Sequence, residues 1–351
     1  MATFSIKNIA IKGISCCVPK NTEYNRDLSL LSKEEIEKFI DATGVEERRI
    51  APQEICTSDL CFEAAEKLIK DLKWNKEEIE ILVFVTQTAD YILPVSATIL
   101  QNRLGLTTNC IAFDVPLGCS GYVYGMSIIA SMMKSAGLKK GLLLAGDTIS
   151  KLVSKFDKST LPIFGDAGSA TALELSDELK EIFFDLGSDG SGFDAIMIPD
   201  GGSRNRVNSS SLKIIKIEAG IERDFCNLIL DGMDVFSFGI SQGPKTVNNL
   251  LQTFNINRDN IDYFIFHQAN LMMNKIIAKK LKLPVEKVPY SLKNFGNTSS
   301  ATIPLTIVTE LKDKVLSESS NILMCGFGVG LSWGTMLVKD CALECLELIE
   351  L

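Results

Sequence analysis

The sequence predicts an α/β protein built from two similar halves, and two observations support this fold class. Apolar runs typical of buried strands alternate with helical patterns, as in residues 81–85, 127–133 and 142–145. The strand-like segments 79–84 and 142–146 also recur further along the chain, at 261–266 and 322–326. Because both offsets are about 180 residues, they indicate a duplicated half of roughly that length.

The other elements fit between these strands. Residues 58–73 carry apolar side chains on one face, which predicts an amphipathic helix. Ser32 and Glu35 have the spacing of a capping box before a shorter helix. The polar segment 200–211 predicts an exposed loop. No linker rich in Pro, Gly or Ser divides the chain, and we expect an N-terminal half over 1–175 and a C-terminal half over 176–351.

Composition excludes several classes of protein. The chain has 351 residues, 46% of them hydrophobic and 23% charged, which is globular rather than disordered usage. Its net charge of −8 makes it a poor candidate for coating nucleic acid, so no nucleic-acid partner is expected. No apolar run approaches the roughly 20 residues that a membrane span needs. The first residues lack the pattern of a signal peptide, and ten cysteines without one predict reduced thiols and a cytoplasmic protein.

The cysteines do not predict a metal site. Cys56 and Cys61, like Cys341 and Cys345, lack the CxxC spacing typical of zinc ligands, and the chain has a single histidine. We expect no metal and interpret most of the cysteines as small core residues.

Cys119 is the exception, because glycines lie on both sides of it and a helical pattern begins directly after it. A thiol at a helix N-terminus feels the positive end of the helix dipole, which lowers its pKa and favours the nucleophilic thiolate. The small neighbours would let a substrate carbonyl approach. The same segment also fits a buried cysteine at a tight turn.

His267 and Asn297 occupy related places in the second half. His267 follows an apolar strand and precedes a helix, where α/β proteins often carry functional groups. Asn297 lies in a glycine-flanked turn, at nearly the position that Cys119 has in the first half. A two-fold fold would bring all three to the junction of the halves. Taken singly, the histidine also fits a structural role and the asparagine a turn or cap.

The glycine-rich segment 326–334 resembles a phosphate-binding loop at first sight. Residues 335–338 after it predict a strand, however, whereas a dinucleotide site needs a helix there. We interpret the segment as a tight turn between strands. Its backbone N–H groups, for example that of Val329, would be available to an oxyanion.

Together these segments resemble the thiolase-like superfamily, and within it the β-ketoacyl-acyl-carrier-protein synthase III family. The matching motifs follow one another along nearly the whole chain, at residues 43–49, 118–121, 164–168, 231–236, 267–270, 296–299 and 328–330. The resemblance implies a five-layered α-β-α-β-α fold of two duplicated halves, and a homodimer.

The resemblance also implies a reaction. Cys119 would take an acyl group from a coenzyme A or acyl-carrier-protein thioester and condense it with a malonyl thioester, which loses CO2. His267 and Asn297 would stabilise the enolate, while the backbone N–H groups of Cys119 and Val329 would form an oxyanion hole. No cofactor is implied. Leu93 matches a segment that in the family reaches across the dimer to the acyl pocket, and ordinary interface packing explains it equally well.

The chain departs from the family where coenzyme A is held. Positions that carry Trp or Arg in common members are here Lys38, Ala42, Lys158 and Met272. Free acyl-CoA is therefore a doubtful donor, since lysine offers only a point charge. Lys275, Lys279 and Lys282 recur on one face of a predicted helix, and we expect them to dock an acidic carrier protein; a solvated helix face is the alternative.

Three other functions remain open on the sequence. The acyl group on Cys119 could pass to an amine or hydroxyl of a sugar or secondary metabolite. The chain could be a non-catalytic partner subunit, although all three candidate residues are intact. A cysteine hydrolase would instead use His267 as a general base beside the thiol.

Overall fold

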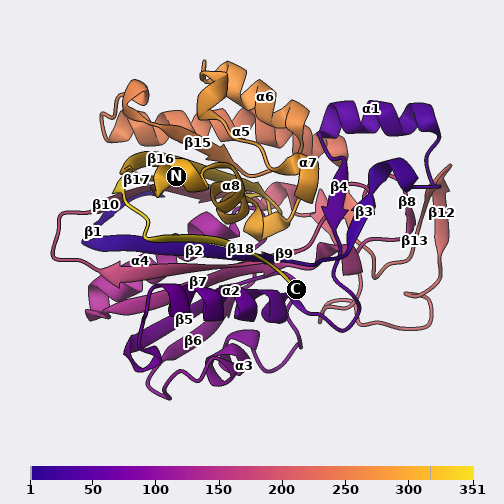
Figure 1. The fold of residues 1–351 in the computed structure, drawn as a ribbon. Helices are drawn as coiled ribbons and strands as arrows, with labels where there is room; N and C mark the ends of the chain where they lie inside the picture. Colours follow the sequence, from indigo (N-terminus) through magenta and orange to yellow (C-terminus); the bar gives the residue numbers. More distant parts are fainter. Residues whose placement is uncertain (1, 317) are drawn as a thin grey trace.

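Two mixed β-sheets form the centre of the protein in a computed structural model, which describes residues 2–316 and 318–351 (Figure 1). In the first sheet the strands lie in the order β18 (Cys345–Glu350), β2 (Ile9–Val18), β9 (Ala167–Leu175), β7 (Lys140–Asp147), β5 (Ile79–Val85) and β6 (Ile111–Val115). In the second the order is β1 (Ala2–Lys7), β10 (Glu181–Ser188), β17 (Ser332–Cys341), β16 (Ser320–Gly328) and β15 (Tyr263–Phe266).

The duplication predicted from the sequence is present in the pairing of the strands. β5 runs parallel to β7, and its counterpart β15 runs parallel to β16. On the far side of each pair an antiparallel strand follows, β9 in the first sheet and β17 in the second. The order β2-β9-β7-β5 thus corresponds to β10-β17-β16-β15, with both repeated segments in equivalent places.

The terminal strands do not stay with the half of the sequence to which they belong. β1 pairs with β10 in the second sheet, while β18 pairs with β2 in the first. The expected boundary at 175/176 falls in the turn between β9 and β10. Each sheet nevertheless takes an edge strand from the other end of the chain, and a division into two domains stays a prediction.

Helices complete five layers, as the fold prediction requires (Figure 1). Between the two sheets lie α4 (Gly121–Ala136) and α8 (Thr302–Glu310). The outer face of the first sheet is covered by α2 (Thr57–Asp71) and α3 (Ser96–Arg103), and that of the second by α5 (Gly232–Thr253) and α6 (Leu271–Lys280). Separate apolar clusters fill the spaces between these layers.

The helix sequences reflect their layers. α4 is apolar nearly all round, because both of its faces meet a sheet, and side chains such as Tyr122, Met126 and Ile129 are fully buried. α2 buries only one face, which agrees with the amphipathic pattern of 58–73. The capping box at Ser32 is also confirmed, at the start of α1 (Lys33–Thr43).

Short elements close one end of the molecule. They are the pair β3 (Thr22–Tyr24) and β4 (Glu47–Arg49), the pair β11 (Ile196–Met197) and β14 (Ile229–Leu230), the sheet of β8 (Phe156–Asp157), β12 (Ile215–Glu218) and β13 (Ile221–Arg223), and the short helix α7 (Leu292–Phe295). The short helix α9 (Lys312–Val315) lies elsewhere, beside Tyr263 at the start of β15. Residues 201–210 are exposed, as predicted for the loop there, whereas Asp200 is half-buried and Ser211 is buried.

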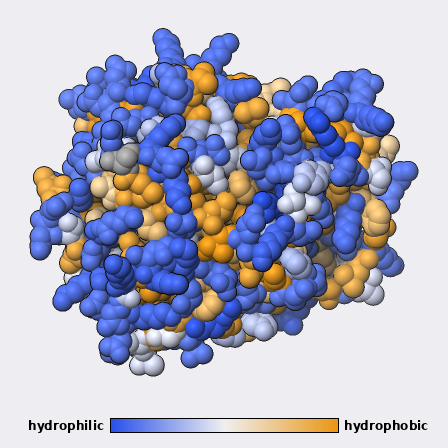
Figure 2. Space-filling model, viewed as in Figure 1, coloured by the Kyte–Doolittle hydropathy of each residue, from blue (hydrophilic) through white to orange (hydrophobic). Residues whose placement is uncertain are grey.

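Polar side chains cover most of the face shown in Figure 2, and apolar ones gather in patches between them. Within the described residues, no helix combines the length and the apolar character that crossing a bilayer requires.

Candidate active site

Cys119 lies at the entrance of α4, one residue before its N-cap Ser120, in the space between the two sheets. The turn is tight, since Gly121 N–H donates to the Gly118 carbonyl at 2.7 Å. From the other half, β16 passes directly beside the thiol. A Cβ atom on Gly328 would lie 2.7 Å from Cys119 Sγ, so only glycine leaves room for the sulfur at that position.

Burial raises the pKa of Cys119 to about 11. The sequence argument from the helix dipole expected a lowered pKa and is wrong for the free protein, because the thiol is only 8% exposed and desolvation outweighs the favourable groups around it. Hydrogen bonds from the backbone N–H of Val329, the Ser299 side chain and the backbone of Cys119 itself act in the opposite direction. The resting form is therefore the thiol, and a base is needed to form the nucleophile.

His267 follows the end of β15, and its backbone N–H donates to the Cys325 carbonyl of β16 at 2.8 Å. Its ring lies edge-on to Phe327, and Nδ1 is 2.8 Å from Thr302 Oγ1 on α8. Only 1% of the residue is exposed, and this burial lowers the pKa of His267 to about 3. The imidazole is therefore neutral at physiological pH.

Asn297 is held by backbone contacts on both sides. Its N–H donates to the Ile163 carbonyl at 2.9 Å, and its own carbonyl accepts from Gly165 N–H at 3.1 Å. In the side chain, Oδ1 accepts from Ser299 N–H at 2.9 Å. This hydrogen bond fixes the orientation of the amide and leaves the donor Nδ2 for a ligand.

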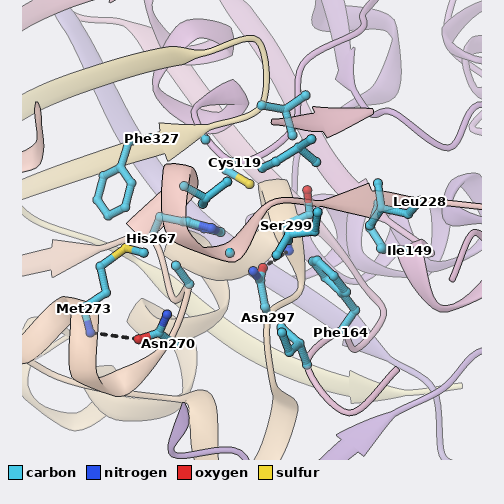
Figure 3. A pocket seen from close by; sticks show the side chains of 18 of the residues that line it. Cys119, Ile149, Phe164, Leu228, His267, Asn270, Met273, Asn297, Ser299 and Phe327 are labelled. Atoms are coloured by element: carbon cyan, nitrogen blue, oxygen red, sulfur yellow. Dashed lines mark hydrogen bonds between the residues drawn. The ribbon is translucent and has the colours of Figure 1, made fainter. Parts of the chain in front are cut away.

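One cavity of about 230 Å³ brings these groups together (Figure 3). Cys119, His267 and Asn297 all line it, as the sequence predicted from the two-fold arrangement, and Val329 of the glycine-rich turn lines it as well. The rest of the wall is largely apolar and includes Ile149, Ile163, Phe164, Ile196, Leu228, Leu230, Val235, Met273 and Phe327. Such a channel suits an acyl chain or a flexible thioester arm, with its polar groups at the thiol end.

The other candidate residues lie outside this cavity. Leu93 is 81% exposed in the segment between β5 and α3 and does not reach the cavity of its own chain. Lys275 and Lys279 line a surface groove between α6 and α1, together with Asp41 and Met272. Lys282 is exposed just beyond the end of α6 and is not part of that groove.

The structure adds residues that sequence reasoning missed. Ser299 takes a left-handed conformation with φ of 52°, and its backbone and side chain contact His267, Asn297 and Cys119. Asp147, fully buried at the end of β7, accepts from Gln87 N–H and from the Ser300 hydroxyl, both at 2.7 Å. It thereby ties the strand ends of the first half to the turn that carries Asn297. A Gly-Asp pair after a strand indicates only a turn, so this link could not be predicted from the local pattern.

The layered fold, with a cysteine at the start of a central helix, places the protein in the thiolase-like class. Comparisons with known proteins are more specific. Residues 113–190 match the family model 3-Oxoacyl-[acyl-carrier-protein (ACP)] synthase III, and 251–340 match the model for its C-terminal part. The first range contains Cys119; the second contains His267, Asn297 and Val329.

Similar proteins carry the same family name. Beta-ketoacyl-[acyl-carrier-protein] synthase III of Fusobacterium nucleatum is 32% identical over 335 residues, covering 95% of this chain and 99% of the relative. The protein of that name from Clostridioides difficile is 32% identical over 329 residues, covering 94% and 97%. The crystal structure of 3-oxoacyl-(acyl-carrier protein) synthase from Burkholderia xenovorans LB400 superimposes with a TM-score of 0.93 at 37% identity, covering 100% of this chain and 99% of that one.

The chain belongs to the 3-oxoacyl-[acyl-carrier-protein] synthase III family. It is an acyltransferase of that type, as the sequence predicted. The comparisons do not favour the alternative transfer of the acyl group to an amine or a hydroxyl.

Proposed function

We propose that Cys119 carries the acyl group in this enzyme and that His267 and Asn297 hold the malonyl thioester with which it condenses. The observation that supports this assignment is the shared cavity, where residues from both halves line one apolar channel around the thiol. The proposed steps use no metal ion or redox cofactor.

In the first step the Cys119 thiolate attacks the thioester carbonyl of the acyl donor, and the carrier thiol leaves. The carbonyl oxygen becomes negative as the tetrahedral intermediate forms. The backbone N–H groups of Cys119 and Val329, which hydrogen-bond the sulfur in the free protein, are the donors to that oxygen.

In the second step the malonyl thioester loses CO2, and the resulting carbanion attacks the acyl group on Cys119. Negative charge builds on the thioester oxygen of the malonyl group during this loss. Asn297 Nδ2 is oriented to donate to that oxygen, because Oδ1 is already engaged by Ser299 N–H. Removing one such donor typically costs about 10²–10³ in rate.

Intact mass measurement tests the acyl-enzyme directly. Incubation with an acyl thioester should add one acyl group to the wild-type protein and none to Cys119→Ala. The CO2 released from a labelled malonyl thioester then separates condensation from transfer to an amine or hydroxyl. An acylated enzyme that never releases CO2 from the malonyl thioester would contradict the proposal, as would an adduct that persists in Cys119→Ala.

An acyl carrier protein fits this chain better as the donor than free acyl-CoA. Lys38 Nζ lies 2.7 Å from Glu34 Oε1, and Lys158 Nζ lies 3.2 Å from Glu35 Oε1. Both lysines are thus already paired with carboxylates of α1 and offer little net charge to coenzyme A phosphates. Lys275 and Lys279, by contrast, have no ion pair with any described residue.

The position of these two lysines agrees with docking near the channel. Asn270, the N-cap of α6, lines the cavity, and Lys275 and Lys279 follow about 7.5 and 13.5 Å further along the helix axis. The double variant Lys275→Glu/Lys279→Glu should raise KM for carrier-bound donor and leave KM for acyl-CoA nearly unchanged. Lys70→Glu, on α2 in the opposite outer layer, is the matched control. An unchanged KM for the carrier-bound donor would rule out this docking surface, including the more distant Lys282.

A homodimer would cover an exposed apolar segment. Tyr91, Ile92 and Leu93 are 62%, 91% and 81% exposed, and the neighbouring strand β6 is the free edge of the first sheet. Both features are typical of a surface that pairs with another chain. Sedimentation of Leu93→Asp should show a shift towards the monomer relative to wild type; a wild-type protein that is monomeric would contradict the dimer.

All ten cysteines are free thiols, in agreement with the cytoplasmic location, which stays a prediction.

A further inference from the structure

Gln87 is a polar side chain of the cavity that the reaction steps described above do not use. It lies just after the end of β5, and its backbone N–H donates to the buried carboxylate of Asp147 at 2.7 Å. Its side chain lines the same cavity as the Cys119 thiol. The backbone hydrogen bond therefore holds this side chain at the cavity wall.

Gly118 leaves room for the amide of Gln87 beside the nucleophile. A Cβ atom on Gly118 would overlap the end of that side chain, with Gln87 Cδ at 2.8 Å and Oε1 nearer still. Ser299 Oγ approaches the same point to 3.2 Å, and the Ser299 side chain also hydrogen-bonds the thiol (Figure 3). Because Gly118 directly precedes Cys119, the amide lies near the first carbons of an acyl group on the sulfur rather than near the far end of a long chain.

The side-chain amide of Gln87 has no hydrogen-bond partner among the described residues. By contrast, two other polar side chains of the cavity are hydrogen-bonded within the protein. Asn270 Oδ1 accepts from Met273 N–H at 2.8 Å, and the Ser159 hydroxyl donates to a neighbouring carboxylate at 2.5 Å. Gln87 is exposed, so solvent can satisfy its amide in the free protein, whereas an alkyl group packed against it cannot.

We propose that Gln87 is a specificity-determining residue of the acyl site and selects a donor whose acyl group carries a hydroxyl on C2 or C3. Such a hydroxyl can donate to Oε1 or accept from Nε2, so it fits either orientation of the amide. A plain alkyl group would leave the amide unpaired, and a site of that kind discriminates against the analogue without the polar group. The inference rests on the proposed role of Cys119 and names the class of acyl group that it accepts.

The transfer step itself is the one proposed above. The sulfur of Cys119 forms a bond to acyl carbon C1, the bond from C1 to the carrier sulfur breaks, and the thiol proton of Cys119 ends on the carrier thiol. The hydroxyl of the acyl group keeps its proton and forms no covalent bond. Gln87 thus contributes to the choice of donor and leaves the chemistry of the transfer unchanged.

Matched pairs of donors test this preference in the absence of a malonyl thioester. The 3-hydroxybutanoyl and 3-methylbutanoyl thioesters differ by a hydroxyl in place of a methyl group, as do the 2-hydroxybutanoyl and 2-methylbutanoyl thioesters. All are presented on the same acyl carrier protein, with each enantiomer separate, and the single-turnover rate of Cys119 acylation is measured by intact mass. In at least one pair the hydroxyacyl donor should react at least about 10-fold faster with the wild-type protein. Equal rates within both pairs, or faster methyl donors in both, overturn the proposal.

Two variants test the part played by the amide. Gln87→Met keeps the length of the side chain and removes its hydrogen-bonding groups, so the ratio of the hydroxyacyl rate to the methyl-acyl rate should fall by about 10-fold. The inductive effect of the hydroxyl on the thioester is the same in both proteins and cancels in this comparison. In Gly118→Ala the added Cβ displaces the amide without removing it, and the ratio should fall there as well.

Gln252→Met is the matched control, because Gln252 is exposed in the last turn of α5 and does not line the cavity. It should keep the wild-type ratio. If Gln87→Met also keeps that ratio, or if the control loses it equally, the amide of Gln87 does not select the donor. The wild-type ratio decides the preference even where a variant fails to fold. Acylation without any preference overturns only this inference, whereas a Cys119 that no thioester acylates overturns the proposed function with it.

Discussion

Gly328→Ala tests the packing of one half of the protein against the nucleophile of the other. An added Cβ would lie 2.6 Å from Cys119 Cβ and 2.7 Å from Cys119 Sγ. Non-bonded carbon atoms normally stay about 3.5–4.0 Å apart, so one of the two segments must move by about 1 Å. Rotating the thiol does not relieve the contact with Cys119 Cβ, because that atom is fixed by the backbone turn before the central helix, and Gly328 is held at the end of β16.

The expected loss follows from that displacement. A shift of about 1 Å at the reacting atoms can cost about 10²-fold in rate, and overpacking of this kind typically destabilises a protein by about 1–3 kcal/mol. Acylation of Cys119 should therefore slow by about two orders of magnitude in Gly328→Ala, while the protein remains folded.

The assay is single-turnover acylation followed by intact mass, together with thermal unfolding. Gly190→Ala is the control, because a Cβ there meets nothing within 4 Å and its φ is not in the left-handed region. A Gly328→Ala protein that is acylated at the wild-type rate would show that the close approach of β16 does not constrain the thiol.

Three further predictions concern charge and burial. Arg48 is fully buried and donates hydrogen bonds to Asn25 Oδ1, the Phe164 carbonyl and Glu23 Oε2. At about 1 kcal/mol per lost hydrogen bond, Arg48→Met should lower the free energy of unfolding by about 3 kcal/mol, as measured by denaturant titration. Alkylation of Cys119 should rise with pH from neutral towards about 11; a plateau near pH 7 would contradict its raised pKa. His267 has a pKa of about 3 in the folded protein and 6.5 in the unfolded chain, so between these pH values the unfolded state binds more protons. The free energy of unfolding therefore has its full value above pH 6.5 and decreases as the pH falls below it. His267→Gln should reduce that loss between pH 7 and pH 4.5, as measured by unfolding at both pH values.

The sequence predicted the fold through its internal repeat. Segments 79–84 and 261–266 are matched strands in both sheets because each is buried on two faces and so keeps a continuous apolar pattern. The placement of β1 and β18 could not be predicted. A six-residue strand carries no local signal for the sheet it joins, and both pair with residues more than 170 positions away.

The site was predictable as a set of residues but not as an environment. Cys119 and His267 are recognisable from their places beside strands and helices. The raised pKa of the thiol arises from burial against β16, which is more than 200 residues away in the chain. The contact between Thr302 and His267 could not be predicted either, because a threonine at the start of a helix is typical of a capping residue. Its contact with the ring depends on α8 lying between the sheets.

The exchange of terminal strands has a consequence for the order in which the protein can be assembled during synthesis. β2 is made within the first 18 residues, yet the strand that covers its outer edge, β18, is made only at residues 345–350. Until then one edge of the first sheet has unpaired backbone groups, which is the kind of surface on which chains aggregate. The first sheet thus begins to be translated early but is completed last. Its completion requires contacts that span almost the full sequence, which is typical of slow folding.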